Sequence, residues 1–455
     1  MSCSGKKRLF FQAKFGSALT ALATMLCSVS QAAFSEQELK GGSDANSDSK
    51  TNSTDNTKID FSLTEAAANE LTMKLNELVS SKYFDKAIVE KTWNPAFAVY
   101  KPVLLSQRNL LQFSKKANEL LAILHTSHTQ FLTPNDEAFY FMRSLFGSFN
   151  KDEKDPHKND ADFTGLGVGG AQADSNQVRY VLDASPAALA GFKRGDKILS
   201  VDRKAFSGYA DWFQRSGKVT AVAVERGGKI IELKITPKKQ DFLEGYVTAT
   251  ERSARVIEKN GKRIGYLHFW SGGNGSHDAL EAAISEKFSG TDALILDLRD
   301  GYGGASLDDL DIFFRPKSAF PDIRTYGRGE YRFERSYYDK PLVALVNGGV
   351  RSGKELLAYG LKRSHRATLI GVPTAGFVVA GQFNPLTKNA ILYLAVLDIK
   401  LDGLRLEGKG VAPDILLEDK LGADDPLLNR ALAFLSSQVK TSSAPALRPR
   451  PSKRH

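Results

Sequence analysis

The sequence predicts an α/β core that follows a helical region and a small β-rich module. Three observations predict this fold class. Apolar residues recur at helical spacing between about 61 and 150, short strand-like runs crowd residues 163–238, and apolar runs alternate with helical stretches from about 263 onward. With 455 residues, 42% of them hydrophobic and 25% charged, the chain has the length and composition of a globular protein of roughly two or three domains.

The formal net charge of +10 is concentrated at the two ends of the chain. The first 32 residues contain four cations and no acid, and the last fifteen contain four more cations: Lys6, Lys7, Arg8, Lys14, Arg448, Arg450, Lys453 and Arg454. Without these eight charges the body of the chain carries +2. A nearly neutral body lacks the broad basic surface typical of nucleic-acid binding, so we expect no nucleic-acid partner.

Residues 1–32 have the pattern of a secretory signal peptide. A basic start is followed by the apolar stretch Phe15–Val29 and by small residues at Ser30 and Ala32, and cleavage is expected near Ala32 or Ala33. The mature protein is therefore expected to be exported, to the periplasm if the source is a Gram-negative bacterium and out of the cell otherwise. A lipoprotein signal centred on Cys27 is a weaker interpretation, because the bulky Leu26 precedes that cysteine.

Cys3 and Cys27 are the only cysteines, and both lie in the predicted signal. The mature chain therefore has no thiol, which excludes disulfides, thiolate metal sites and cysteine nucleophiles. No later stretch is long and apolar enough to span a bilayer, so we expect no integral membrane segment after signal removal.

Two segments precede the β-rich module. Residues 33–60 are polar and nearly free of large apolar side chains, which predicts a flexible linker. Residues 61–150 are predicted to form an N-terminal helical region, because apolar residues such as Leu71, Leu75 and Val79 recur on one helical face. A charged, proline-containing break follows this region.

The module and the core complete the chain. Residues 160–240 are predicted to form the β-rich module, with strands at Val178–Leu182, Lys197–Val201, Val219–Val224 and Lys229–Ile235 and a short helix from Pro186 to about Gly191. Residues 245–438 are predicted to form the core, with strands at Arg263–Phe269, Ala293–Leu298, Leu342–Val346 and Ala367–Ile370. The basic tail 439–455 is predicted to be disordered.

Ser352 is the first candidate functional residue. It lies in the turn between the apolar run Leu342–Val346 and the helical stretch Ser352–Lys362, which is how many folds present a nucleophile. Backbone N–H groups and the positive end of the helix dipole at such a turn favour a developing oxyanion. The alternative is structural, because Ser352 and Glu355 also spell the S-x-x-E capping box.

Two signatures mark the β-rich module. The first is Asp162-Phe-Thr-Gly-Leu-Gly-Val168, and the second is Ser185-Pro-Ala-Ala-Leu-Ala-Gly-Phe-Lys-Arg-Gly-Asp-Lys-Ile-Leu-Ser-Val-Asp202. Together they resemble a PDZ domain. The resemblance implies that the amides of Leu166 and Gly167 receive the terminal carboxylate of a peptide, which the neighbouring strand edge adds as a further strand. A dinucleotide loop is a poor alternative, since no helix follows these glycines.

The core carries a glycine-rich segment, Leu294-Ile-Leu-Asp-Leu-Arg-Asp-Gly-Tyr-Gly-Gly304, before the Ser352 turn. With the later run Arg366-Ala-Thr-Leu-Ile-Gly-Val-Pro-Thr-Ala-Gly376, these motifs resemble the C-terminal processing, or tail-specific, serine peptidase family over roughly residues 61–430. The resemblance implies a crotonase-like core with Ser352 as the nucleophile. It also implies an oxyanion hole made by amides of Gly303 or Gly304 and of Gly353.

The chain departs from this family at the catalytic lysine. Typical members carry a lysine in a T-F-G-K-G element, where this chain has Thr374-Ala-Gly-Phe-Val378, and the side chain of Phe377 cannot accept a proton. Lys354 is two residues beyond Ser352 on the same helix and is expected to point to a different face, so it is not a substitute base.

A histidine offers another base. Leu124-His-Thr-Ser-His-Thr129 and Arg405-Leu-Glu-Gly-Lys-Gly-Val-Ala-Pro-Asp414 resemble the histidine-bearing and glutamate-bearing segments of the tricorn-like branch of the same superfamily. The resemblance implies His128 as the base, Glu407 as its orienting carboxylate and Ser127 as a supporting hydroxyl. His125 and His128 also form H-x-x-H, but no third ligand is evident, so no metal site is expected.

The sequence thus predicts an exported serine endopeptidase that acts on protein or peptide substrates and needs no metal or organic cofactor. The oligomeric state stays open. A noncatalytic peptide-binding scaffold is the alternative, motivated by Phe377 and by the capping-box interpretation of Ser352. A histidine base with an ordinary pKa predicts that kcat/KM falls as the pH drops through about 6 to 7.

Overall fold

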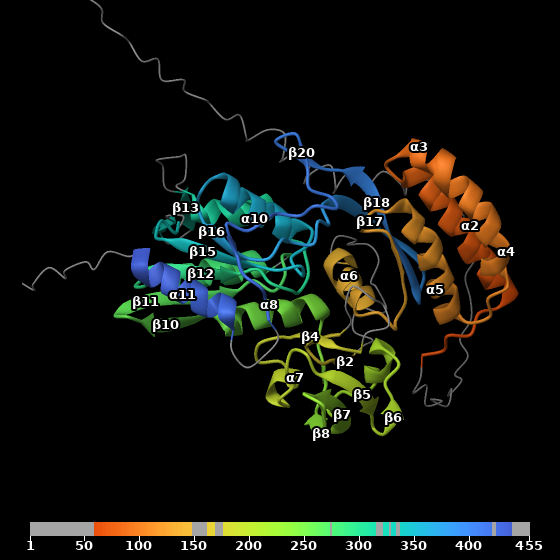
Figure 1. Cartoon of the computed structure of the whole chain (residues 1–455), viewed down its shortest axis with the longest axis horizontal. Coiled ribbons are helices and arrows are strands. Elements are labelled where there is room, and N and C mark those ends of the chain that lie inside the picture. The colour runs from red at the N-terminus through yellow and green to blue at the C-terminus, as the bar shows by residue number, and fades with distance from the viewer. Residues whose placement is uncertain are drawn as a thin grey trace, which may run out of the picture. The chain divides into compact units, whose positions relative to one another are not determined.

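The computed structural model describes residues 59–147, 162–168, 176–273, 275–314, 322–326, 329–333, 337–420 and 425–438 (Figure 1). The predicted signal 1–32, nearly all of the predicted linker 33–60 and the predicted tail 439–455 lie outside these residues. Of the helices in the described ranges, none is both long enough and apolar enough to cross a membrane.

The core is built on a six-stranded sheet in the order β10-β11-β12-β15-β16-β21. The β10 strand is antiparallel to β11, and the other neighbours are parallel. The strands are Arg255–Lys259, Lys262–His268, Ala293–Asp297, Leu342–Val346, Thr368–Gly371 and Ile415–Leu416. Four of them, β11, β12, β15 and β16, lie within one residue of the strands expected from apolar runs, because strands covered on both faces are continuously apolar.

Helices cover both faces of this sheet. Leu294 and Leu296 of β12 pack on the face covered by α10 (Gly353–Arg363), whereas Ile295, whose side chain points the other way, packs with α11 (Pro426–Gln438). The first face also carries α9 (Ser276–Ala282), η4 (Ala283–Lys287) and η5 (Leu307–Phe313). Small hairpins complete the core: β13 (Asp322–Tyr326) with β14 (Gly329–Phe333), and β19 (Lys400–Leu401) with β20 (Leu404–Arg405).

The N-terminal helices pack against a separate three-stranded sheet. This sheet has the order β1-β18-β17, with strands Gln130–Leu132, Ala390–Asp398 and Val379–Thr387. The helices are α2 (Glu65–Lys82), α3 (Lys86–Ile88), η1 (Val89–Trp93), α4 (Asn94–Leu105), α5 (Leu110–Leu121) and η2 (Ala122–Leu124). Leu71, Leu75 and Val79 are buried in this contact, as their spacing predicts.

Strand β1 carries the end of the helical region onto the core. Its central residue, Phe131, is buried and pairs with Leu392 of β18. The Asn118 side chain holds both main-chain groups of Phe131, since its Oδ1 accepts from the amide at 2.8 Å and its Nδ2 donates to the carbonyl at 2.9 Å. These bonds fix the chain three residues after His128.

The β-rich module shares a hydrophobic cluster with Trp270 and Tyr302 of the core and with Ile391 and Tyr393 of β18. It contains a four-stranded sheet, β6-β5-β7-β8, and two strand pairs, β2-β9 and β3-β4. Its elements are β2 (Asp162–Phe163), β3 (Leu166–Val168), β4 (Val178–Val181), α7 (Pro186–Leu189), β5 (Lys197–Val201), β6 (Lys204–Ala205), η3 (Tyr209–Trp212), β7 (Thr220–Arg226), β8 (Lys229–Ile235) and β9 (Lys238–Lys239).

Two helices flank the module in sequence and share its core. They are α6 (Glu137–Gly147) and α8 (Phe242–Ser253), which contribute Phe139, Phe141 and Tyr246. The helical periodicity of residues 61–150 groups α6 with the preceding helices, whereas the structure packs it on the module, because its aromatic residues face the apolar side of the module.

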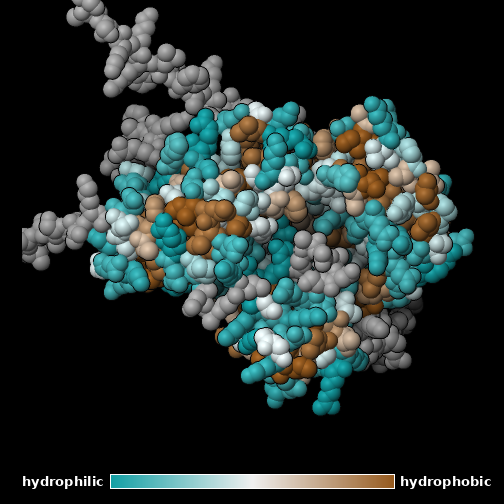
Figure 2. Space-filling model, in the orientation of Figure 1, coloured by the Kyte–Doolittle hydropathy of each residue, from teal (hydrophilic) through white to brown (hydrophobic). Residues whose placement is uncertain are grey.

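Most of the surface in view is hydrophilic, and some of the apolar patches lie on the N-terminal helices (Figure 2). The exposed apolar side chains of that region include Met73 of α2 and Val99 and Val103 of α4. Helix α2 packs on β18 and α4, and α4 packs on α2 and α5, so the side chains that point away from these contacts are exposed.

We predict that Leu392→Ala destabilises the protein by about 2–5 kcal/mol, because it opens a cavity where the helices meet β18. Leu392 is fully buried in this contact. Leu189→Ala, at a leucine that is 83% exposed, is the control and is expected to change stability by less than about 0.5 kcal/mol. Urea unfolding followed by circular dichroism measures both. Equal unfolding midpoints for the two variants would contradict this packing.

Candidate active site

Ser352 adopts a strained backbone at the start of α10. Its φ of 55° and ψ of −131° lie outside the regions that residues with a side chain normally occupy. Its amide donates to Phe377 O at 3.0 Å, and its side chain makes no capping hydrogen bond to the helix. A hydroxyl held on a sharp strand-to-helix turn without a capping role is free for chemistry.

Glu355 does not form the capping box that the sequence pattern suggests. Its buried carboxylate accepts from Thr374 Oγ1 at 2.5 Å, from Gly376 N at 2.8 Å and from Phe377 N at 2.7 Å. Burial raises the pKa of Glu355, and these bonds oppose that shift. The capping-box interpretation is therefore wrong for this turn, and Glu355 instead fixes the loop beside Ser352.

Two of the three glycines expected to form an oxyanion hole, Gly303 and Gly353, lie next to Ser352. A Cβ on Gly303 would stand 2.6 Å from the Cβ of Ser352, and a Cβ on Gly353 would stand 2.0 Å from Ala305 O, so only glycine fits at either position. In the part of the chain that the structure describes, the amides of Gly303, Gly304 and Gly353 donate no backbone hydrogen bond. Free amides beside a hydroxyl can stabilise an oxyanion.

Ser127 links His128 to Glu407. Ser127 Oγ donates to Glu407 Oε2 at 3.0 Å and lies 2.9 Å from His128 Nδ1, while Ser127 N donates to Glu407 Oε1 at 2.7 Å. Because the hydroxyl proton is directed to the carboxylate, Nδ1 must carry the imidazole proton and donate it to Oγ. The lone pair then lies on Nε2, the nitrogen left free to act as a base.

The surroundings of His128 favour a neutral imidazole. Burial, and after it the nearby Arg351 guanidinium, lower the pKa of His128 to about 4. The ring lies against Tyr393, with 5.2 Å between ring centroids. The loss of base function expected at pH 6 to 7 for an ordinary histidine therefore moves toward pH 4.

We call the hydrogen-bonded set His128, Ser127 and Glu407 the histidine relay. Two hydrogen bonds donated by main-chain amides connect the Ser352 turn to this relay. Phe377 O accepts from Ser352 N, and the next amide, Val378 N, donates to Glu407 Oε2 at 2.7 Å. Glu407 is therefore shared by the core loop and the helical region. Within the described ranges no direct hydrogen bond joins His128 to Ser352, so the relay and the loop connect the two residues. The Phe377 side chain is 42% exposed and takes no part in these bonds.

The residues expected to hold a peptide carboxylate are buried. Leu166 is 1% exposed, and a Cβ on Gly167 would lie 2.2 Å from the Tyr180 ring. Burial raises the pKa of Glu137, at the start of α6, to about 7, although hydrogen bonds from Tyr246 and from the Val168 amide lower it. Glu137 at the start of α6 therefore contacts the Val168 amide at the end of β3, and Leu166 and Gly167 are buried in this structure.

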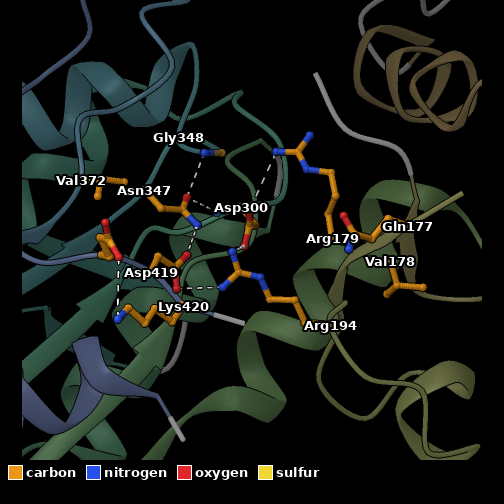
Figure 3. Close-up of a pocket in the computed structure, with 12 residues that line it drawn as sticks. Gln177, Val178, Arg179, Arg194, Asp300, Asn347, Gly348, Val372, Asp419 and Lys420 are labelled. Atoms are coloured by element: carbon orange, nitrogen blue, oxygen red, sulfur yellow. Dashed lines mark hydrogen bonds and ion pairs between the residues drawn. The ribbon is translucent and has the colours of Figure 1, made fainter. Parts of the chain in front are cut away.

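A cavity of about 480 Å³ lies between the β-rich module and the core (Figure 3). Arg179 and Arg194 of the module both reach toward Asp300, each at 3.9 Å, and Arg194 also donates to Asp419 at 2.8 Å. Asp300 immediately precedes Gly301, so these contacts join the module to the glycine-rich loop that carries Gly303.

Two core histidines, His268 and His277, have structural partners. His268 stacks on Trp270 with 3.4 Å between ring centroids, and its Nε2 lies 2.8 Å from Arg299 O. His277 Nδ1 lies 3.1 Å from Asp309 Oδ1. Neither histidine has a hydrogen bond to Ser352 among the described residues, whereas His128 is connected to the Ser352 turn through Ser127 and Glu407.

Comparison with known proteins identifies the core. Residues 263–417 match the description "Peptidase family S41". Over these residues the core is similar to peptidase family S41. The carboxy-terminal-processing protease of Bartonella bacilliformis is 31% identical over 298 residues, which are 60% of this chain and 64% of that protein. The chain thus matches less than two thirds of that relative, and the resemblance to C-terminal processing peptidases drawn from the motifs is confirmed.

A second sequence relative and one solved structure are also similar to this chain. The tricorn protease of Thermoplasma volcanium is 25% identical over 273 residues, 54% of this chain and 25% of that protein. The structure of the photosystem II D1 C-terminal processing protease matches 83% of this chain and 99% of its own, with a TM-score of 0.50 and 20% identity. That match supports the fold of the S41 core and its flanking regions.

The sequence alone missed two residues that shape the S41 site. Glu355 matched the capping pattern, and only the bonds to Gly376 and Phe377 show that it holds a loop. Arg351 was not singled out, although its guanidinium donates to Gly301 O at 2.8 Å and acts on the pKa of His128. A cation beside a candidate nucleophile was the available hint.

We predict that the His128 imidazole titrates near pH 4, with Nδ1 protonated in the neutral form, because burial opposes its charge. Nitrogen-15 NMR of histidine-labelled protein measures both the pKa and the tautomer. The spectrum of His128→Gln assigns the resonance. A pKa of 6.5 or above, or a neutral form protonated on Nε2, would contradict the relay through Ser127.

Proposed function

We propose that this protein is an exported serine endopeptidase that cleaves envelope proteins or peptides. The observation that carries the proposal is the connection between the strained Ser352 turn and the Ser127, His128 and Glu407 relay through one buried carboxylate. The names of the related C-terminal processing and tricorn proteases support a peptidase.

The proposed chemistry is acyl transfer. Ser352 Oγ attacks the peptide carbonyl while His128 Nε2 takes the hydroxyl proton, and the resulting imidazolium is stabilised through Ser127 by Glu407. Amides of Gly303 or Gly304 and of Gly353 stabilise the oxyanion. His128 then gives its proton to the leaving amine, and a water molecule activated by the same nitrogen hydrolyses the acyl-enzyme and regenerates Ser352.

Recognition is assigned to the β-rich module, which we propose is a PDZ domain at residues 160–240 within a crotonase-like peptidase. It would present C-terminal or apolar segments to the S41 core through Leu166 and Gly167. Because α6 lies beside this strand, a bound peptide has to compete with Glu137 for the strand edge. The proposed export rests on the signal pattern of residues 1–32.

The alternative function is a catalytically inactive peptide-binding scaffold. It drew on Phe377, which replaces the family lysine, and on a capping role for Ser352. The lack of a capping bond from Ser352 removes one of these two supports. The second support, Phe377 at the place of the family lysine, is weaker because His128 offers a base whose Nε2 is left free by the relay.

We predict that a fluorophosphonate probe labels the folded wild-type protein and fails to label Ser352→Ala. Phosphonylation requires an activated hydroxyl, and only Ser352 occupies the strained turn. Ser364→Ala, which changes a serine at the other end of α10, is the control and retains labelling. The scaffold is supported if the folded wild type is unlabelled across pH 4 to 9, and another nucleophile is implied if Ser352→Ala is labelled.

We predict that His128→Ala lowers kcat/KM by about 10²- to 10⁴-fold, because the general base is lost. His125→Ala is the matched control, since His125 lies three residues earlier and is exposed, and its activity is expected to stay within about twofold. Cleavage of fluorescein-labelled casein measures both variants. Near-normal cleavage by His128→Ala would show that the assigned base is incorrect.

A further inference from the structure

Lys354 is a fully buried cation in the first turn of α10. Its Nζ donates to three main-chain carbonyls, those of Phe269 and Trp270 at 3.1 Å each and that of Asp300 at 2.5 Å. Three acceptors match the three N–H donors of an ammonium group. Lysine is among the residues that are rarely buried, so this arrangement needs an explanation beyond packing.

The three carbonyls belong to the two segments that shape the glycine-rich loop. Phe269 and Trp270 follow β11, and Asp300 begins the loop that continues to Gly303. The same segments are also joined by main-chain bonds, from Tyr302 N to Trp270 O at 3.1 Å and from Gly272 N to Gly303 O at 2.8 Å. Lys354 therefore ties both segments to the helix that carries the Ser352 turn.

A second cation, Arg351, precedes Ser352 in the sequence and binds the same glycine-rich loop. Arg351 donates to Gly301 O through Nε at 3.1 Å and through Nη2 at 2.8 Å. The carbonyls of the consecutive residues Asp300 and Gly301 are thus bound by the two cations that flank Ser352 and Gly353. This arrangement fixes the loop amides relative to the candidate nucleophile.

Burial makes the Lys354 charge costly. It lowers the pKa of Lys354 to about 7, and the Asp300 carboxylate opposes that shift. The three N–H donors point at carbonyls, and among the described residues Nζ has no bond to Ser352. Lys354 therefore does not take the place of the base that Phe377 replaces, as its position two residues beyond Ser352 led us to expect.

We infer that Lys354 is a positioning residue for the acyl transfer proposed above. By holding Phe269, Trp270 and Asp300, it keeps the amides of Gly303 and Gly304 beside Ser352. The inference rests on the proposed function, and it adds a residue that acts on the oxyanion hole through the main chain of the loop.

The test compares Lys354→Met with wild type in the rate of fluorophosphonate labelling at Ser352. Methionine keeps a long apolar side chain but has no N–H donor, so the loop loses three bonds while the core stays filled. We expect the maximal rate constant kinact to fall about 10²-fold, with the inhibitor constant KI within about threefold. The labelled fraction at saturation stays complete, because every folded molecule still carries Ser352.

Lys362→Met is the matched control on the same helix. Lys362 is partly exposed, and its Nζ donates to Ala412 O at 2.7 Å, away from the loop. Its kinact is expected to stay within about twofold of wild type. A role for Lys354 in folding alone would lower the labelled fraction and leave the rate of the folded molecules unchanged, and that result overturns the inference.

The remaining outcomes are also decisive. If the wild type is labelled and Lys354→Met reacts at the same rate, this inference is wrong and the proposed function stands. If the folded wild type is never labelled, both fail. If Lys354→Met does not fold, Lys354→Gln, which keeps two N–H donors, replaces it, and a kinact equal to that of wild type then overturns the inference, whereas a fall of about tenfold or more supports it.

Discussion

The buried carboxylate of Glu407 is the contact on which the candidate site depends. It accepts from Ser127 N and Ser127 Oγ of the helical region, 280 residues earlier in the sequence, and from Val378 N of the core, so one side chain joins the two segments. Apolar packing around Phe131 brings these segments together, but packing has no direction. The hydrogen bonds to Glu407 orient the Ser127 hydroxyl, and they therefore decide which nitrogen of His128 is left free.

Glu355 and Glu407 divide one short loop between them. Glu355 accepts from the amides of Gly376 and Phe377, and Glu407 accepts from the next amide, that of Val378. The Phe377 carbonyl in turn receives Ser352 N. Three consecutive amides thus fix the loop that connects the Ser352 turn to the histidine relay. A strained backbone at a functional site persists only when several such contacts hold it in place.

The sequence predicted the elements whose signal is local. The continuous apolar run of β15 and the alternation in β8 predict their strands to the residue, because burial on both faces or on one face leaves that pattern. The capping pattern at Ser352 and Glu355 was misleading, since the same residue types serve a helix end or a loop clamp and only tertiary bonds distinguish them. The covered strand at Leu166 and the loop contacts of Lys354 also depend on long-range packing that no local pattern encodes.

An uncharged side chain at position 377 has a physical rationale in the charges around Ser352. Arg351 and Lys354 already place two cations beside the turn, and Arg351 lowers the pKa of His128. A third cation at position 377 would lower the pKa of His128 further. The main chain of Phe377 makes its bonds to Glu355 and Ser352 whatever its side chain, so a neutral residue there preserves the geometry without adding charge beside the imidazole.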